Sequence, residues 1–433
     1  MSAASFLADI TSLARRLPAS RHVLNICDDR YRFAVGLAAS IITKKVSLLP
    51  STHTPQIIRQ LAQFAPDVFC MTDDPSCDIA LPLFHYRDGP SETVPWQIPQ
   101  IDAEQLIAYV FTSGSTGMPV PHKKTWERLV RCVREGAQRL GLMHGGPYAM
   151  LGTVPAQHMY GFESTVLTCL QSSNALCAER PFYPADICAC IAALPRPRVL
   201  ISTPIHLRSL LGAEVDLPPV DLIVSATATL SPQLALDAER RFAAPLLEIY
   251  GSTETGQIAS RRTVETQQWH LWPNVNLSIE DGRAWANGGH IEQRTAMGDV
   301  LEVTGEERFV LHGRTEDLVN IAGKRGSLGY LNHHLNAIPG VVDGAFFVRE
   351  DERPSPTGVT RLAAFVVAPG LSAALLLDRL RERIDPVFLP RPLLFVDRLP
   401  RNATGKLARE TLRSLAASAP EFALADLGRP WAR

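Results

Sequence analysis

The feature that most restricts the fold of this chain is an alternation of short β-rich runs with helix-like stretches. Stretches typical of helices include Thr125–Leu140 and Pro232–Phe242. The β-rich runs are Val23–Ile26, Val46–Leu49, Val68–Met71, Ile107–Thr112, Val199–Ser202, Leu222–Ser225 and Leu246–Tyr250. This alternation predicts an α/β fold with a mostly parallel sheet. Because ligands of such sheets collect at the carboxyl ends of the strands, polar motifs directly after these runs are candidate sites.

The pattern changes from about Leu271, where shorter and more polar β segments begin. Beyond residue 318 the chain has a compact α+β pattern, with strand-like and helix-like runs at Val341–Val348, Leu362–Val367, Ala373–Arg383 and Leu393–Val396. A chain of 433 residues with 46% hydrophobic composition exceeds what one core usually supports. We therefore predict a large N-terminal α/β domain with a β-rich subdomain over residues 1–315. A small, mobile α+β domain is predicted over residues 316–433.

The charge and cysteine content restrict the partners and the compartment. Basic and acidic residues number 43 and 44, are well mixed and leave a formal net charge of -1. Such a surface has no broad field for nucleic acid or for an anionic membrane. The eight cysteines include no C-x-x-C pair, which favours reduced, buried thiols. The N-terminal stretch Met1–Leu17 carries an aspartate inside its apolar pattern, so we expect an amphipathic helix and a cytoplasmic protein.

A hydroxyl- and glycine-rich stretch, Thr112-Ser-Gly-Ser-Thr-Gly117, follows the run Ile107–Thr112. Glycine lets backbone N–H groups approach an anion closely, and hydroxyls supply further donors. The stretch lacks the Gly-Lys-Ser/Thr ending of a Walker loop. Taken alone, it predicts either a phosphate-binding loop or a plain polar turn.

A second polar stretch, Tyr250-Gly-Ser-Thr-Glu-Thr-Gly256, begins where the run Leu246–Tyr250 ends. A carboxylate among hydroxyls is a hard-oxygen ligand suited to Mg²⁺ that carries phosphates. The alternative is that Glu254 caps a neighbouring helix by accepting backbone N–H bonds. In either case Glu254 is expected at the end of a strand.

Three further motifs have ordinary explanations when each is taken alone. The charged run Gly313–Arg325 could be an exposed linker, and Lys406 in Asn402-Ala-Thr-Gly-Lys406 a solvated surface lysine. His158, in Pro155-Ala-Gln-His-Met-Tyr-Gly161, could be a hydrogen-bonded core histidine. None of the three identifies a function without its context.

Taken in order, these motifs resemble those of the AMP-forming adenylating enzyme superfamily. That superfamily includes acyl- and aryl-CoA synthetases, the adenylation domains of peptide synthetases, and luciferases. The resemblance covers roughly residues 105–410, and an ordered set of motifs is far more specific than any one of them. It implies ATP and Mg²⁺ as cofactors, a small carboxylic acid as substrate, and the thiol of coenzyme A or of a carrier-protein phosphopantetheine as acceptor.

The resemblance also implies roles for individual residues. Lys406 is expected to bridge the substrate carboxylate and the α-phosphate, Glu254 to bind Mg²⁺, and His158 to lie between the carboxylate pocket and the thiol tunnel. The remaining residues implied to hold the nucleotide are Thr112, Ser113, Gly114, Ser115, Thr116, Gly117, Ala226, Thr227, Ala228, Tyr250, Gly251, Ser252, Thr253, Asp299, Arg314 and Arg325. Among these, Asp299 is implied to bind the ribose hydroxyls, with Arg314 beside it, and Arg325 to lie near the terminal phosphates.

The chain departs from the family pattern at two places. After Gly117 the family usually has x-Pro-Lys, whereas here the sequence is Met118-Pro-Val120, followed by His122-Lys-Lys124. We expect Lys123 or Lys124 to supply the missing cation. The second departure is Tyr330, which stands where the family has an acidic residue and puts the local helix packing in question.

The activity that the resemblance implies has two steps. The acid attacks MgATP to give an acyl-adenylate and pyrophosphate, and a thiol then displaces AMP. Because Lys406 must give way to the thiol, the C-terminal domain is expected to swing about Glu316 or Asp317. The loop variant is similar to that of stand-alone ligases of aryl polyene-type pathways, which favours an aromatic acid such as a hydroxybenzoate or hydroxycinnamate. A medium-chain fatty acid ligase and a catalytically silent adenylate-binding protein are the alternatives.

Overall fold

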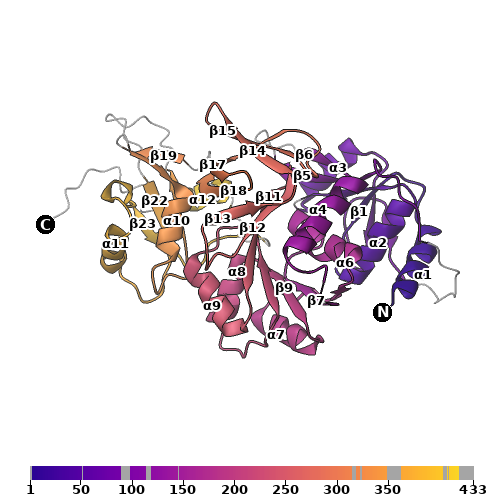
Figure 1. The fold of residues 1–433 in the computed structure, drawn as a ribbon, viewed down its shortest axis with the longest axis horizontal. Coiled ribbons are helices and arrows are strands. Elements are labelled where there is room, and N and C mark those ends of the chain that lie inside the picture. Colours follow the sequence, from indigo (N-terminus) through magenta and orange to yellow (C-terminus); the bar gives the residue numbers. More distant parts are fainter. Residues whose placement is uncertain are drawn as a thin grey trace.

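The structure is a computed structural model that describes residues 2–50, 52–88, 98–113, 119–144, 146–314, 318–321, 324–348, 362–402, 407 and 409–418. Two large sheets form the main part of the molecule, and a smaller group of strands and helices lies at one end (Figure 1). No helix in the described part of the chain is long and apolar enough to span a bilayer.

The first sheet has six strands in the order β4-β3-β1-β2-β5-β6. Their bounds are β1 His22–Asn25, β2 Val46–Leu49, β3 Phe69–Thr72, β4 Leu83–His85, β5 Leu106–Ser113 and β6 Pro119–Thr125. All pair in parallel except β6, which returns antiparallel to β5. Side chains alternate along β1, so that Val23 packs with α1 (Ala3–Ala14) and α2 (Arg30–Ile42), and Leu24 packs with α3 (Pro55–Phe64).

The second sheet has nine strands in the order β17-β18-β13-β12-β11-β10-β9-β7-β8. Their bounds are β7 Ala149–Gly152, β8 Ala175–Leu176, β9 Arg198–Ser202, β10 Leu222–Ser225, β11 Leu246–Ser252, β12 Gly256–Arg261, β13 Gln268–Leu271, β17 Asp299–Gly305 and β18 Arg308–Arg314. The half from β8 to β11 is parallel, and the half from β11 to β17 is antiparallel. Strands β17 and β18 of the antiparallel half lie in the β-rich segment predicted from about Leu271, whereas β12 and β13 precede it.

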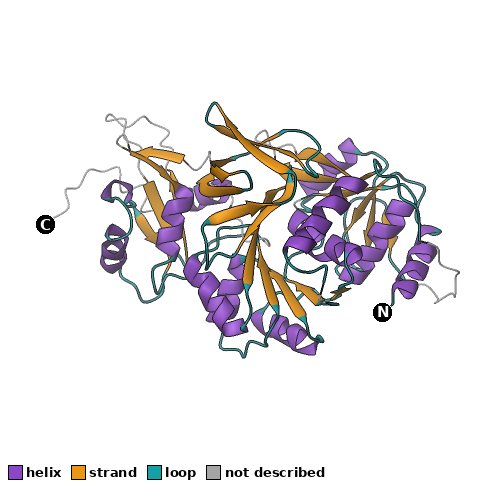
Figure 2. Ribbon diagram, viewed as in Figure 1, coloured by secondary structure: helices purple, strands orange, loops and turns teal. Residues whose placement is uncertain are grey.

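Helices cover both faces of this second sheet (Figure 2). One face packs against α7 (Pro184–Ala193), α8 (Pro204–Gly212) and α9 (Pro232–Phe242). The other face packs against α4 (Trp126–Arg139), whose residues also reach the core of the first sheet. Beside α4 runs a continuous helical stretch made of α5 Met159–Gly161, a π-helical turn Phe162–Leu167 and α6 Thr168–Gln171. These helices therefore lie between the two sheets.

Smaller sheets complete the chain. A three-stranded sheet holds β14 Val275–Glu280, β15 Arg283–Gly288 and β16 Thr295–Ala296, and a hairpin holds β19 Leu318–Ile321 and β20 Lys324–Ser327. The C-terminal sheet holds β21 Asp343–Val348, β22 Leu362–Val367 and β23 Leu393–Phe395. The helices of this part are α10 Leu328–Asn336, α11 Ala373–Arg381, the 3₁₀ turn Pro386–Phe388 and α12 Arg409–Ser418. Its core is separate from those of the large sheets.

The predicted fold class is confirmed, and each strand-like run of the sequence lies in a strand of the structure. The bounds differ by one or two residues, as at Ala373–Arg383, whose helix ends at Arg381. Tyr330 does not disturb α10, because its exposed ring lies edge-on to His334 while Leu331 and Leu335 are buried. The predicted domain boundary at residues 315–317 lies outside the described residues and stays a prediction.

Candidate active site

Strand β5, which leads into the predicted phosphate loop, and the turn that carries Glu254 meet between the two large sheets. Thr112 near the end of β5 has its Oγ1 2.9 Å from Nε2 of His122 on β6. The same Nε2 lies 3.6 Å from Oε1 of Glu254, in the turn between β11 and β12. Residues far apart in the sequence thus come together where the first sheet faces the second.

The antiparallel pairing of β5 and β6 decides which side chains face Glu254. Val110 is opposite His122, and Ala108 is opposite Lys124, so alternate residues of β6 share one face. Lys124 is buried, and its Nζ donates to the backbone carbonyl of Glu254 at 3.4 Å. Lys123 is exposed. The cation beside the Glu254 turn is therefore Lys124.

Three influences set the pKa of the His122 imidazole. Burial lowers its pKa below the usual value, the charge of Glu254 opposes this shift, and the charge of Lys124 adds to it. Because the net pKa shift is downward, His122 is neutral near pH 7. A neutral imidazole can accept or donate a hydrogen bond without repelling a bound cation.

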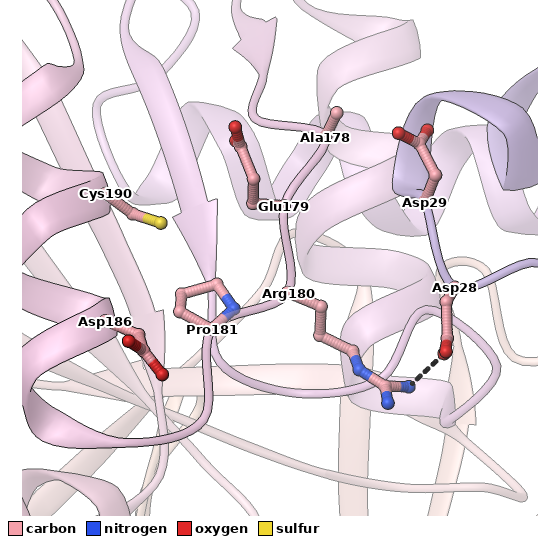
Figure 3. Close-up of a pocket in the computed structure, with 8 residues that line it drawn as sticks. All are labelled: Asp28, Asp29, Ala178, Glu179, Arg180, Pro181, Asp186 and Cys190. Carbon is pink, nitrogen blue, oxygen red and sulfur yellow. Dashed lines mark ion pairs between the residues drawn. The ribbon is translucent and has the colours of Figure 1, made fainter.

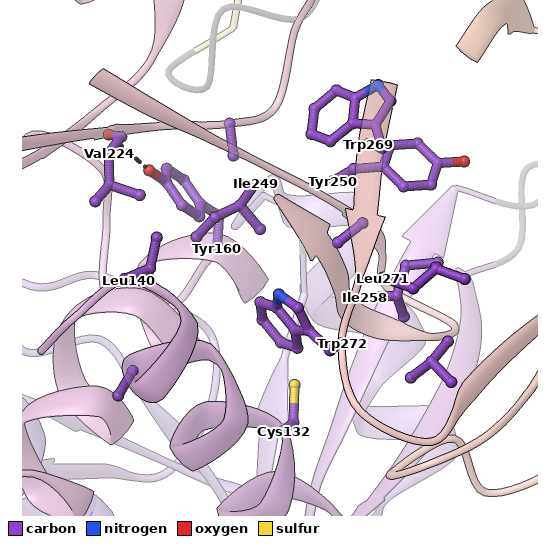
Figure 4. Packing of buried hydrophobic residues seen from close by; sticks show 14 of the residues in the cluster. Cys132, Leu140, Tyr160, Val224, Ile249, Tyr250, Ile258, Trp269, Leu271 and Trp272 are labelled. Atoms are coloured by element: carbon purple, nitrogen blue, oxygen red, sulfur yellow. Dashed lines mark hydrogen bonds between the residues drawn. The ribbon is translucent and has the colours of Figure 1, made fainter. Parts of the chain in front are cut away.

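Tyr250 and Asp299 form a second pair on the antiparallel half of the large sheet. The Tyr250 hydroxyl donates to Oδ2 of Asp299 at 2.6 Å. The centroid of the Tyr250 ring lies 5.5 Å from that of Trp269 (Figure 4). It lies 5.4 Å from the ring centroid of Phe309. Asp299 also pairs in register with Arg314 across β17 and β18, so the backbone places those two residues side by side.

The close approach of β11 to β12 requires glycine at position 251. A Cβ at Gly251 would lie 2.2 Å from the carbonyl oxygen of Gly256, far inside van der Waals contact. The turn that follows is held by reciprocal contacts, since each of Ser252 and Thr255 donates its backbone N–H to the hydroxyl of the other, both at 3.2 Å. These contacts hold the backbone of the turn that carries Glu254.

We expect Gly251→Ala to lower the free energy of unfolding by about 1–3 kcal/mol, because the added methyl must push β11 and β12 apart. The same shift should lower ATP-dependent activity. Urea unfolding and pyrophosphate exchange measure the two effects. Gly212→Ala is the matched control, since a Cβ there meets nothing within 4 Å. Equal stability of the two variants would contradict the tight approach.

A buried polar cluster behind Glu254 was not predicted from the sequence. Glu163, in the π-helical turn, is buried, and its Oε1 accepts from Cys132 Sγ at 3.4 Å. Burial raises the pKa of Glu163, which the charges of Lys124 and His290 oppose. His290 Nε2 lies 3.1 Å from the carbonyl oxygen of Thr255. The available signal was one carboxylate in the otherwise apolar and hydroxyl-rich segment 160–170.

The other described site residues lie at the same edge of the parallel strands. Ala226, Thr227 and Ala228 follow β10 directly, and Thr227 has a φ of 80°. His158 follows β7 and caps α5, with Nδ1 accepting from the backbone N–H of Tyr160 at 3.3 Å. Strands β7, β9, β10 and β11 are parallel neighbours, so their carboxyl ends lie at one edge of the sheet, where ligands of such sheets bind.

Several predicted site residues lie outside the described part of the chain. These are Gly114, Ser115, Thr116, Gly117 and Lys406, together with the side chains of Ser113, Arg314 and Arg325. Their roles, and those of the other site residues, stay predictions. The hinge residues Glu316 and Asp317 also lie outside it.

A pocket that is separate from the predicted site residues lies where the start of α2 faces the segment before α7 (Figure 3). It is lined mainly by charged residues, and Arg180 pairs there with Asp28 at 3.1 Å. None of the predicted site residues lines it. The pocket that includes Glu254 is lined as well by Lys124, Arg128, Glu163 and His290.

Comparison with known proteins shows the family of this chain. Residues 21–284 match the family of AMP-binding enzymes, and residues 334–406 match the AMP-binding enzyme C-terminal domain. The chain therefore belongs to the AMP-binding enzyme family. The family and the enzyme class predicted from the sequence, an AMP-forming acid–thiol ligase that uses ATP, are confirmed.

Among curated relatives, the 4-coumarate–CoA ligase of Rhodobacter capsulatus is 32% identical over 70% of this chain and 75% of its own length. The 4-chlorobenzoate–CoA ligase of an Arthrobacter species is 27% identical over 71% of this chain and 65% of its own length. The 3-hydroxybenzoate/4-hydroxybenzoate–CoA ligase of Thauera aromatica is 23% identical over 83% of this chain and 75% of its own length.

Solved structures share the fold over nearly the whole chain. The anthranilate CoA ligase AuaEII in complex with anthranoyl-AMP superposes with a TM-score of 0.81 at 15% identity, covering 96% of this chain and 92% of that one. ATP-bound MatB from Rhodopseudomonas palustris gives 0.79 at 18% identity, covering 96% and 93%.

Proposed function

We propose that this protein activates an aromatic carboxylic acid with MgATP and transfers the acyl group to the thiol of coenzyme A. The observation that carries the proposal is the meeting of Glu254, Thr112 and His122 where the first sheet faces the second, together with the Tyr250–Asp299 hydrogen bond on the second sheet. The aromatic preference is supported by relatives named as ligases of coumarate, chlorobenzoate and hydroxybenzoate.

Two displacement reactions make up the activity. A carboxylate oxygen of the acid attacks the α-phosphorus of ATP, the bond from that phosphorus to the bridging oxygen breaks, and pyrophosphate leaves. The thiolate sulfur then attacks the acyl carbon, and AMP leaves with the electrons of the acyl–oxygen bond. Negative charge moves during both steps, so fixed cations and hydrogen-bond donors stabilise the transition states most.

The residues present suit a magnesium ion. Glu254 presents a half-exposed carboxylate close to the Thr112 hydroxyl and to a neutral imidazole. Mg²⁺ prefers oxygen ligands, and it is commonly held by one or two carboxylates together with substrate phosphates. Glu254 would hold it, and the ion would neutralise charge on the phosphates. Tyr250 keeps the Asp299 carboxylate oriented for the ribose, and Lys406 would contact the α-phosphate.

Two thiols are candidate acceptors of the acyl group. Coenzyme A is favoured because the relatives described above are CoA ligases. A carrier-protein phosphopantetheine has the same reacting thiol and is the second candidate. The consumption of ATP and a thiol acceptor also supports the cytoplasmic location that we propose.

The test is acid-dependent exchange of pyrophosphate into ATP across a panel of aryl and alkyl acids, followed by thioester formation with each thiol. We expect saturable exchange with hydroxybenzoates or hydroxycinnamates, and thioester formation with coenzyme A. Tight saturation by a medium-chain fatty acid and none by aryl acids would overturn the aromatic assignment. Nucleotide binding without any exchange would mark a silent adenylate-binding protein instead.

A further inference from the structure

Lys124 is a buried cation whose position calls for a ligand. The residue is 7% exposed, and it lines the pocket that is also lined by Glu254, Glu163 and His290. Burying an ammonium group is unfavourable unless it is paired and hydrogen-bonded. A ligand that pairs with the Lys124 ammonium group would offset this cost.

The contacts within the protein leave that charge only partly compensated. Nζ donates to one backbone carbonyl, that of Glu254, at the long distance of 3.4 Å. Among the described residues, no carboxylate comes within 4.0 Å of it. Glu163 lines the same pocket, and its burial raises the pKa of that carboxyl. An anion from outside the chain would complete the set of contacts.

The strand geometry shows where such an anion would lie. His122 and Lys124 project from the same face of β6, and that face meets the Glu254 turn. Thr112 adds a hydroxyl within 2.9 Å of the His122 ring. Arg128, in the first turn of α4, lines the pocket that holds Lys124 and Glu254. Lys124, Arg128 and the Glu254 carboxylate thus line one pocket, and the His122 ring links that carboxylate to the Thr112 hydroxyl.

We propose that Lys124 binds the β- and γ-phosphates of MgATP, and the pyrophosphate formed from them, with His122 orienting Thr112 and Glu254 beside it. The inference rests on the proposed function, and it names the residue that takes the place of the lysine missing at Val120. Lys123 is excluded because it is exposed and alternates to the opposite face of β6. The competing explanation is structural, with Lys124 only holding the Glu254 turn.

The experiment compares the dissociation constants of MgATP and of AMP, measured by titration calorimetry without acid. AMP lacks the β- and γ-phosphates, so a phosphate contact changes the ratio of the two constants, whereas a distorted turn changes both. Lys124→Met should weaken MgATP binding by about 10- to 100-fold while AMP binding changes by less than about threefold. Lys123→Met is the matched control and should leave both constants unchanged.

Two more variants keep the test decisive if Lys124→Met does not fold. Lys124→Gln retains an N–H donor for the Glu254 carbonyl but not the charge, so it should show the same selective loss. Lys124→Arg keeps the charge and should preserve most of the ratio between the two constants. Equal weakening of MgATP and AMP in Lys124→Gln, or no weakening of either, would overturn the inference.

The wild-type protein separates this inference from the proposed function. If the wild type binds MgATP and exchanges pyrophosphate but Lys124→Gln does so equally well, only the role of Lys124 fails. If the wild type shows no acid-dependent exchange with any acid, the proposed function fails, whatever the binding ratios are.

Discussion

Replacing Lys406 by alanine is expected to slow acid-dependent pyrophosphate exchange by about 100-fold or more. Thioester formation from a preformed acyl-adenylate should continue at close to the wild-type rate. The reason is that the proposed contact of Lys406 with the α-phosphate stabilises charge that moves only in the first step. In the second step the thiol occupies the space near the acyl carbon, and Lys406 is not required there.

The described residues around this segment show how the C-terminal part is attached. Arg401 holds Asp343 through two contacts, Nε to Oδ2 at 2.7 Å and Nη2 to Oδ1 at 2.8 Å. Asp343 on β21 lies 3.9 Å from Nη1 of Arg208, which belongs to α8 of the large part. Asp343, the first residue of β21, is thus linked by charge to α8 of the large part, and a swing of the C-terminal part would have to break this contact with Arg208.

Single-turnover measurements of the two half-reactions check this prediction. The preformed adenylate bypasses the first step, so the second half-reaction is an internal control for folding. A Lys406→Ala variant with near-normal exchange would contradict the assigned role. Equal loss in both half-reactions would indicate a general structural defect instead.

Much of the fold could be predicted because its signals are local. The β-rich runs at Leu222–Ser225 and Leu362–Val367 coincide with β10 and β22, since buried parallel strands and core strands are continuous apolar runs bounded by polar residues. The return strand β6 was harder to predict. Its sequence, Pro-Val-Pro-His-Lys-Lys-Thr, is polar and contains two prolines, which is typical of an edge strand rather than of a buried one.

The site was predictable only where a motif was complete. Glu254, Tyr250 and Asp299 lie in motifs that are intact in this sequence, but the hydrogen bond between Tyr250 and Asp299 does not follow from those motifs. His122 and Glu163 have no motif, and their importance depends on the register of β5 with β6 and on the packing of the π-helical turn. Register and packing arise from long-range contacts, so the sequence left the choice between Lys123 and Lys124 open.

Replacing Glu254 by glutamine is the second substitution with a large expected effect. The amide keeps the shape of the side chain but removes the charge that would hold Mg²⁺, so pyrophosphate exchange should fall on the order of 100-fold. Raising the Mg²⁺ concentration should restore part of the rate, because a weaker site is filled by mass action. The rate is measured as a function of Mg²⁺ at saturating ATP and acid.

The pKa of His122 gives a second measure of the Glu254→Gln substitution, and this measure does not depend on catalysis. Burial lowers the pKa of His122, and the negative charge of Glu254 opposes that shift, so removing the charge should lower the pKa further. Titration of the imidazole by NMR should therefore move to lower pH in Glu254→Gln. Glu292→Gln is the matched control, since Glu292 lines the same pocket but accepts its hydrogen bond from Thr125 at 3.1 Å. If the Glu292 variant loses as much exchange as the Glu254 variant, the carboxylate acts through the general charge of the pocket and not as a metal ligand.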